Sequence, residues 1–72
     1  MTVSLLAWLA ENEKRDAIME CRNQSLFIKM REHTEKGWKN IYKSIPLEEI
    51  RLARIDVINH TIQGMIEEME GA

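Results

Sequence analysis

Residues 46–70, PLEEIRLARIDVINHTIQGMIEEME, carry the clearest structural signal in this chain of 72 residues. Apolar residues recur there at alternating spacings of three and four, which is the period of one face of a helix. The pattern predicts a helix over residues 46–70 whose apolar seam packs against another helix, either within one subunit or between two. The residues of this seam are Leu52, Ile55, Ile58, Asn59, Ile62, Met65, Ile66 and Met69.

Asn59 is the polar member of the predicted seam. A polar residue on such a seam can select one pairing register at a cost in stability. Alternatively, Asn59 lies at the border of a broad core face. We favour the border position because Ile55, Ile62 and Met69 define the centre of the seam.

The remainder of the chain is also predicted to be helical. Residues 3–10 are nearly all apolar, which indicates a short buried helix. Asn12 either separates it from a second helix over residues 13–36 or lies in a polar turn of one continuous helix. Gly37 suits the position just after a helix end, and residues 38–44 then form a short amphipathic helix. The spacings of three and four within residues 13–36 involve Ile18, Cys21, Ser25 and Ile28.

Together these segments predict an all-α fold, in which two long helices and short flanking helices close as a small bundle. A chain of 72 residues forms one domain. Cys21 is the only cysteine, so no intrachain disulfide can stabilise the fold. A core of this size rarely supplies more than about 3–5 kcal/mol. We therefore expect a homodimer that completes the bundle.

Charge is segregated along the chain although the net charge is only −2. Residues 22–43 hold six basic and two acidic residues, whereas residues 44–72 hold two basic and six acidic ones. The basic segment offers a candidate phosphate-binding face. Alternatively, the acidic C-terminal helix neutralises this face. The candidate phosphate-binding residues are Lys29, Lys36, Lys39 and Lys43.

Motifs of catalysis are absent from the sequence, which holds no nucleophile elbow, P-loop or dinucleotide fingerprint. We therefore expect a protein that is not an enzyme and uses no cofactor. Asp56 and His60 stand four residues apart, but a structural zinc site needs four ligands, so no metal site is predicted. No apolar run approaches the roughly 18 residues of a membrane span, and no basic residue precedes residues 3–10 as in a secretory signal. A cytoplasmic location is expected.

The predicted function is that of a small regulator that binds a protein partner of unknown identity. Inhibitors, antitoxins, anti-repressors and assembly factors of bacterial or phage accessory type belong to this class, and they act by occluding a partner surface with a helical face. The alternative is a dimeric nucleic-acid-binding protein that uses the basic face. A peripheral membrane contact through residues 3–9 ranks last, because flanking basic residues are missing. The candidate partner-binding residues are Leu5, Trp8, Leu9, Trp38 and Tyr42.

Overall fold

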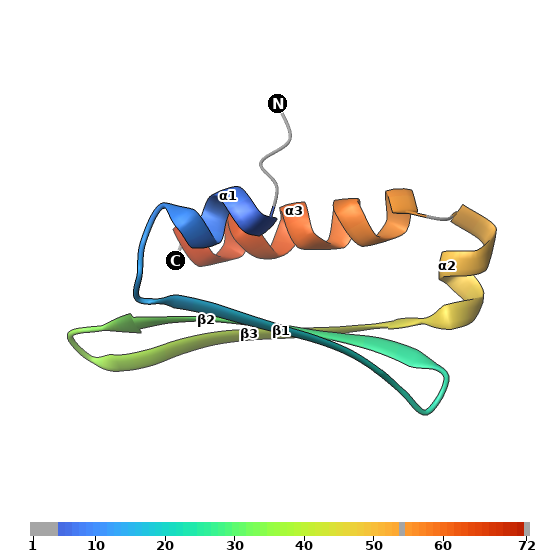
Figure 1. Ribbon diagram of the computed structural model, residues 1–72, viewed down its shortest axis with the longest axis horizontal. Helices are drawn as coiled ribbons and strands as arrows, with labels where there is room; N and C mark the ends of the chain where they lie inside the picture. Colours follow the sequence, from blue (N-terminus) through green and yellow to red (C-terminus); the bar gives the residue numbers. More distant parts are fainter. Residues whose placement is uncertain (1–4, 54, 72) are drawn as a thin grey trace.

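A computed structural model describes residues 5–53 and 55–71, and its centre is a three-stranded antiparallel sheet (Figure 1). The strands are hydrogen-bonded in the order β1-β2-β3. The predicted all-α bundle is therefore wrong, because residues predicted to form helices over 13–36 and 38–44 form strands. The elements in chain order are α1 (Leu5–Ala10), β1 (Arg15–Arg22), β2 (Ser25–Thr34), β3 (Gly37–Pro46), α2 (Leu47–Ala53) and α3 (Ile55–Gly71).

Strand β2 forms the centre of the sheet because its apolar residues alternate with polar or aromatic ones. Leu26, Ile28 and Met30 are buried, whereas Phe27 and Lys29 between them are only half-buried. Successive side chains of a strand point to opposite faces. The strand therefore directs one apolar row into the core and a mixed row to the other face.

Two tight turns connect the three strands. Asn23 and Gln24 both have positive φ, 51° and 64°, which is the backbone of a type I′ hairpin turn. The second turn ends at Gly37, whose φ of 110° favours glycine. The Thr34 hydroxyl donates to the Gly37 carbonyl oxygen at 2.8 Å and closes this turn. Gly37 thus turns the chain from one strand into the next, where the sequence indicated a helix end.

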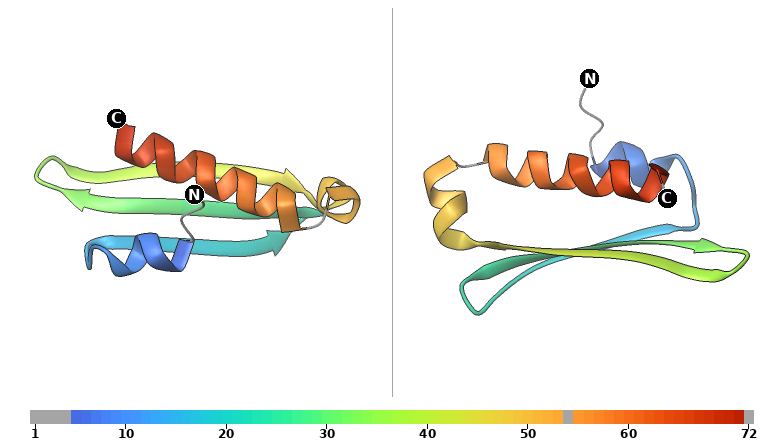
Figure 2. Two further views of the ribbon diagram at one scale, coloured as in Figure 1. Left: turned by 90° about the horizontal axis from the view of Figure 1, so that it is seen from above. Right: turned by 180° about the vertical axis from the view of Figure 1, so that it is seen from behind.

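All three helices lie on the same side of the sheet (Figures 1 and 2). Helix α1 contacts β1 and α3, while α3 also contacts β3. Helix α2 stands at one end of the sheet, where it connects β3 to α3 (Figure 1). The core between the layers consists of Trp8, Leu26, Ile28, Met30, Ile45, Ile62, Met65, Ile66 and Met69.

The predicted seam of the C-terminal helix is largely buried against the subunit's own sheet. Its C-terminal half, Ile62, Met65, Ile66 and Met69, belongs to the core. Ile58 packs partly against this core, whereas Asn59 is exposed and Leu52 is 82% exposed. The side chain of Ile55 lies outside the described part of the structure. A helix–helix seam between two chains is therefore not what buries these residues.

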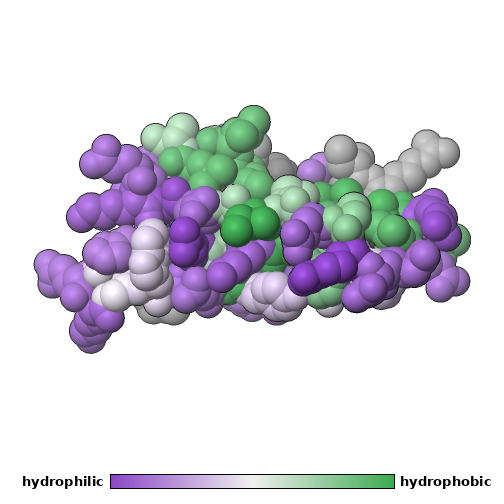
Figure 3. All heavy atoms as spheres, turned by 60° about the horizontal axis from the view of Figure 1, so that its bottom comes forward, coloured by the Kyte–Doolittle hydropathy of each residue, from purple (hydrophilic) through white to green (hydrophobic). Residues whose placement is uncertain are grey.

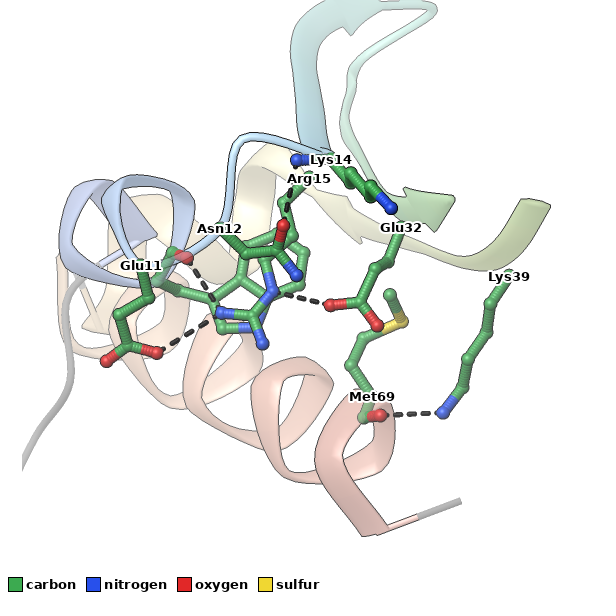
Figure 4. Close-up of polar contacts among 8 residues, drawn as sticks. Glu11, Asn12, Lys14, Arg15, Glu32, Lys39 and Met69 are labelled. Atoms are coloured by element: carbon green, nitrogen blue, oxygen red, sulfur yellow. Dashed lines mark hydrogen bonds and ion pairs between the residues drawn. The ribbon is translucent and has the colours of Figure 1, made fainter. Parts of the chain in front are cut away.

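Arg15, the first residue of β1, joins α1 to the sheet (Figure 4). Its Nε donates to Glu32 Oε2 at 2.6 Å, and its Nη1 donates to the Trp8 carbonyl oxygen at 2.9 Å. The guanidinium also lies 4.7 Å from the centroid of the Trp8 ring and contacts Glu11 at 3.2 Å. The hydrogen bond to Glu32 raises the pKa of Arg15, so the guanidinium stays charged. One side chain therefore fixes the end of α1 over the start of β1.

Two lysines of β3 bind the C-terminal end of α3. Lys39 Nζ donates to the Met69 carbonyl oxygen at 2.6 Å (Figure 4), and Lys43 lies 3.8 Å from Glu68. A cation at a helix C-terminus satisfies its free carbonyl groups and complements the helix dipole. Two lysines of the basic segment therefore contact the C-terminal helix, one at a backbone carbonyl group and one at a carboxylate.

Candidate functional site

The face of the sheet that points away from the helices, called the open face below, carries the candidate site. Its residues follow from the strand register and from the alternation of side chains along each strand. Figure 3, which turns this face toward the viewer, shows hydrophobic and hydrophilic residues interleaved. The open face consists of Asp16, Ile18, Glu20, Arg22, Ser25, Phe27, Lys29, Arg31, His33, Trp38, Asn40, Tyr42, Ser44 and Pro46.

The first aromatic cluster of the open face lies toward the β1–β2 turn. The rings of Phe27 and Tyr42 are 5.8 Å apart between centroids and tilted by 36°. Arg22 lies with its guanidinium 4.9 Å from the Phe27 ring centroid. Tyr42 is 55% exposed, as is expected of a ring that no second layer covers. A hollow of about 230 Å³ opens here, lined by Ile18, Glu20, Arg22, Phe27, Lys29 and Tyr42.

The second aromatic cluster lies toward the β2–β3 turn and centres on Trp38, which is 49% exposed. His33 meets the Trp38 ring edge-on at 5.0 Å and 72°. The Arg31 guanidinium lies 4.2 Å from the Trp38 ring centroid, within the range of a cation–π contact. Trp38 and Tyr42 are four residues apart on one strand, so the two clusters are about 14 Å apart.

Asp16 fixes the position of Arg31 within the second cluster. Arg31 Nη2 and Nε donate to Asp16 Oδ2 at 2.7 and 3.0 Å. These hydrogen bonds lower the pKa of the Asp16 carboxyl group, so it stays ionised at neutral pH. The guanidinium is thereby held in place on the Trp38 ring, which limits the rotamer freedom that a ligand would otherwise have to remove.

The charge of the open face differs from that of the helices. On the described strands β2 and β3, this face carries Lys29 and Arg31 but no carboxylate. Its two acidic residues, Asp16 and Glu20, both lie on β1, and Asp16 is paired with Arg31. Acidic residues are concentrated on α2 and α3, on the other side of the sheet. The two layers thus separate charges that nearly cancel in the whole chain.

The structure divides the predicted partner-binding residues between the core and the open face. Trp38 and Tyr42 are both exposed on the open face. Trp8 is fully buried and belongs to the core, while Leu5 and Leu9 pack partly against it. The two exposed aromatic residues therefore lie on a strand, not on the helical face that the sequence indicated.

The four predicted phosphate-binding lysines do not lie together on one helix. Lys29 lies on the open face, and Lys36 lies in the β2–β3 turn. Lys39 and Lys43 lie on the helix side of the sheet, where they contact Met69 and Glu68 of α3. The predicted basic helix face is therefore wrong, and only Lys29 shares a surface with the exposed aromatic residues.

Sequence reasoning did not single out Phe27, and it assigned Arg22 and Arg31 of the open face only to the basic segment over residues 22–43. The period-two alternation from residue 25 to 31 would have placed Phe27, Lys29 and Arg31 on one strand face. Cys21, which the helical spacing within residues 13–36 involved, is exposed on β1. Among the described residues, no group of three or more His, Cys, Asp or Glu side chains is placed to hold a metal ion.

No helix within the described ranges is both long and apolar enough to cross a membrane. No family model matches the sequence, and neither the curated proteins nor the solved structures give a match.

Proposed function

We propose that the open face binds single-stranded nucleic acid. The observation that carries this proposal is the presence of exposed aromatic rings and cations on one uncovered sheet face. Aromatic side chains on such a face are stacking platforms for unpaired bases, and neighbouring cations contact the phosphates. In this role Tyr42 and Trp38 stack bases, while Lys29, the register partner of Tyr42, and Arg31, which lies against the Trp38 ring, contact the phosphates.

The overall acidity of the chain is compatible with this function because most acidic residues lie off the binding face, and the two that lie on it, Asp16 and Glu20, are paired with Arg31 and Arg22. The electrostatic potential at a bound nucleic acid depends mainly on the nearest charges, because salt screens charges that are more than about 8 Å away. The nearest charges on β2 are Lys29 and Arg31. The acidic groups of α2 and α3 lie across the sheet from them.

Tryptophan fluorescence offers a direct test because the two tryptophans differ in exposure. Trp8 is 0% exposed and Trp38 is 49% exposed, so quenching by a bound base reports on Trp38. Titration with an oligothymidylate of about 12 nucleotides should quench this fluorescence at low salt, and the affinity should fall steeply as salt rises from about 50 to 200 mM.

Two variants identify the surface. Tyr42→Ala should weaken binding about tenfold, because one base–aromatic stack contributes about 1–3 kcal/mol. Lys29→Ala should reduce the salt slope by about 0.7, the value for one phosphate contact on a single strand. Arg51→Ala removes the same charge from an exposed position on α2 and should leave both quantities unchanged.

A protein partner is the second candidate, because Trp and Tyr are the residue types enriched at binding hot spots. The same Trp38 and Tyr42 would then anchor the partner, and the protein would act as a small regulator by covering a partner surface. Absence of oligonucleotide binding at low salt would overturn the nucleic-acid proposal and favour this second candidate.

A further inference from the structure

The outer edge of β1 differs from that of β3 in its protection. Natural edge strands are protected by lysines, prolines or covering elements. Strand β3 carries Lys39 and Lys43 beside its edge, both in contact with α3, and ends at Pro46. On the helix side of β1, Ala17, Met19 and Cys21 form a row without charge. Strand β1 holds no lysine or proline, and its charged residues are Arg15 on the helix side and Asp16, Glu20 and Arg22 on the open face.

Helix α1 covers only the first half of β1. The side chains of β1 are half-buried up to Ala17 and exposed from Ile18 onward. Figure 2 shows the same arrangement from above, with α1 over one half of the strand and no described helix over the other. Met19 is 43% exposed and Ile18 is 51% exposed. Two exposed apolar side chains, Ile18 on the open face and Met19 on the helix side, therefore lie along this edge.

The backbone of this edge can accept another strand. His33 N–H donates to the Lys14 carbonyl oxygen, so the pairs with even residue numbers on β1 are the hydrogen-bonded pairs with β2. In an antiparallel ladder the hydrogen-bonded and non-hydrogen-bonded pairs alternate. Ala17, Met19 and Cys21 consequently direct their N–H and C=O groups away from β2.

We infer that β1 pairs antiparallel with β1 of a second copy of this chain, with Met19 opposite Met19 on the two-fold axis. This register places Asp16 opposite the second copy's Arg22 at both ends of the ladder, which is a favourable cross-strand pair. Ala17 then lies opposite Cys21 within the apolar row. The C-terminal half of β1 in one copy, which α1 leaves uncovered, then pairs with the N-terminal half of β1 in the other copy, which α1 covers.

Two neighbouring registers also keep the open faces of the two copies on the same side of the joined sheet, but both place like charges opposite each other. With Ile18 on the axis, Asp16 lies opposite Glu20. With Glu20 on the axis, the two Glu20 carboxylates face each other. Like charges directly opposite one another destabilise a strand pair, so charge complementarity selects the register centred on Met19. The resulting dimer joins two open faces into one surface with the strand order β3-β2-β1-β1-β2-β3, and this inference does not depend on what that surface binds.

Engineered disulfides test both the pairing and its register. In a Cys21→Ala background, Met19→Cys places two thiols on the axis, where Cα atoms of a hydrogen-bonded pair are about 5.5 Å apart, within disulfide reach. Mild oxidation should convert this variant to a covalent dimer. The unaltered chain should remain uncrosslinked, because its Cys21 residues are four residues out of register, about 14 Å.

Three control variants in the same background locate the interface. Ile18→Cys and Glu20→Cys report the two neighbouring registers, and Ser44→Cys reports the β3 edge. Each should crosslink more slowly than Met19→Cys, and faster or equal crosslinking by any of them would overturn the inference. Sedimentation equilibrium of the unaltered chain should give a two-chain mass that dissociates on dilution. A one-chain mass at every concentration would likewise overturn it, whether or not the cysteine variants fold.

Discussion

Arg15 and Glu32 meet across the β1–β2 pair, where Arg15 Nε donates to Glu32 Oε2 at 2.6 Å. The two residues are direct register partners, and their side chains are only 14% and 21% exposed. Because Arg15 also binds the Trp8 carbonyl oxygen, this ion pair connects the sheet to α1. The contact is partly shielded from water, so it differs from the exposed ion pairs of this chain, such as that of Arg22 with Glu20.

Glu32→Gln should destabilise the protein by about 1.5–3 kcal/mol, the usual contribution of a hydrogen bond to a charged group. The substitution keeps the shape of the side chain but removes the charge that faces Arg15. Urea unfolding followed by circular dichroism measures the change. Glu11→Gln is the matched control, because Glu11 contacts the same guanidinium but is 58% exposed, and it should cost less than about 1 kcal/mol. Equal effects of the two variants would contradict the assignment.

Asp16 gives stability a dependence on acid pH. Hydrogen bonds from Arg31 lower the pKa of Asp16 in the folded protein, so the folded state binds this proton less readily than the unfolded state. The stabilisation is complete above about pH 4, the ordinary aspartate range, and is lost as pH falls through the lowered pKa. At pH 7, the free energy of unfolding of Asp16→Asn should therefore be lower than that of the parent. As the pH is lowered, it should fall by less than the free energy of unfolding of the parent does. Urea midpoints of both proteins from neutral to acid pH test this, and parallel curves would contradict it.

Trp8 is fully buried, and its indole N–H has no hydrogen-bond partner among the described residues. Trp8→Ala should cost about 3–5 kcal/mol, because it removes a large side chain from a packed core. Trp8→Phe should cost less than half as much, since it retains an aromatic ring and removes a buried unpaired donor, which is itself unfavourable by about 1–3 kcal/mol. Thermal unfolding of both variants measures the difference, and equal losses would mean that the N–H is satisfied in solution.

The sequence misleads at β3 because its apolar residues have helical spacing. Trp38, Ile41, Tyr42 and Ile45 stand at i, i+3, i+4 and i+7, the pattern of an amphipathic helix. In the structure they are two strand rows, with Ile41 and Ile45 on the helix side and the two aromatic residues on the open face. A strand with large apolar or aromatic side chains on both faces lacks the alternation of apolar and polar residues by which strands are identified in a sequence.

The same spacing in Ile62, Met65, Ile66 and Met69 belongs to a real helix, although the single helix predicted over residues 46–70 is divided into α2 (Leu47–Ala53) and α3 (Ile55–Gly71). There the exposed positions between the apolar ones are polar, so only one face is apolar and the helical period is unambiguous. The open face could not be predicted in the same way. It depends on the register that places Phe27 beside Tyr42 and Arg31 beside Trp38, and that register follows from the two turns.

The turns themselves are weak sequence signals, which explains why the hairpins were missed. Asn23-Gln24 departs from the Asn-Gly pair typical of a type I′ turn, although both residues adopt positive φ. Gly37 has the residue type that its φ of 110° requires, but glycine is equally typical of a helix end. The strand pairing therefore depends on two turns of which only one contains glycine.

These turns give opposite predictions for glycine. Gly37→Ala should cost about 1–3 kcal/mol, because alanine is strained at this φ; a Cβ at this position would meet no atom within 4 Å, so the loss is conformational rather than steric. Gln24→Gly should instead stabilise the protein by about 0.5 kcal/mol, because glycine relieves the left-handed backbone at φ 64° and this gain exceeds its larger entropy in the unfolded chain. Urea midpoints of the two variants, compared with the exposed control Gly71→Ala, measure both effects. Destabilisation by Gln24→Gly would mean that the β1–β2 turn does not have the type I′ backbone in solution.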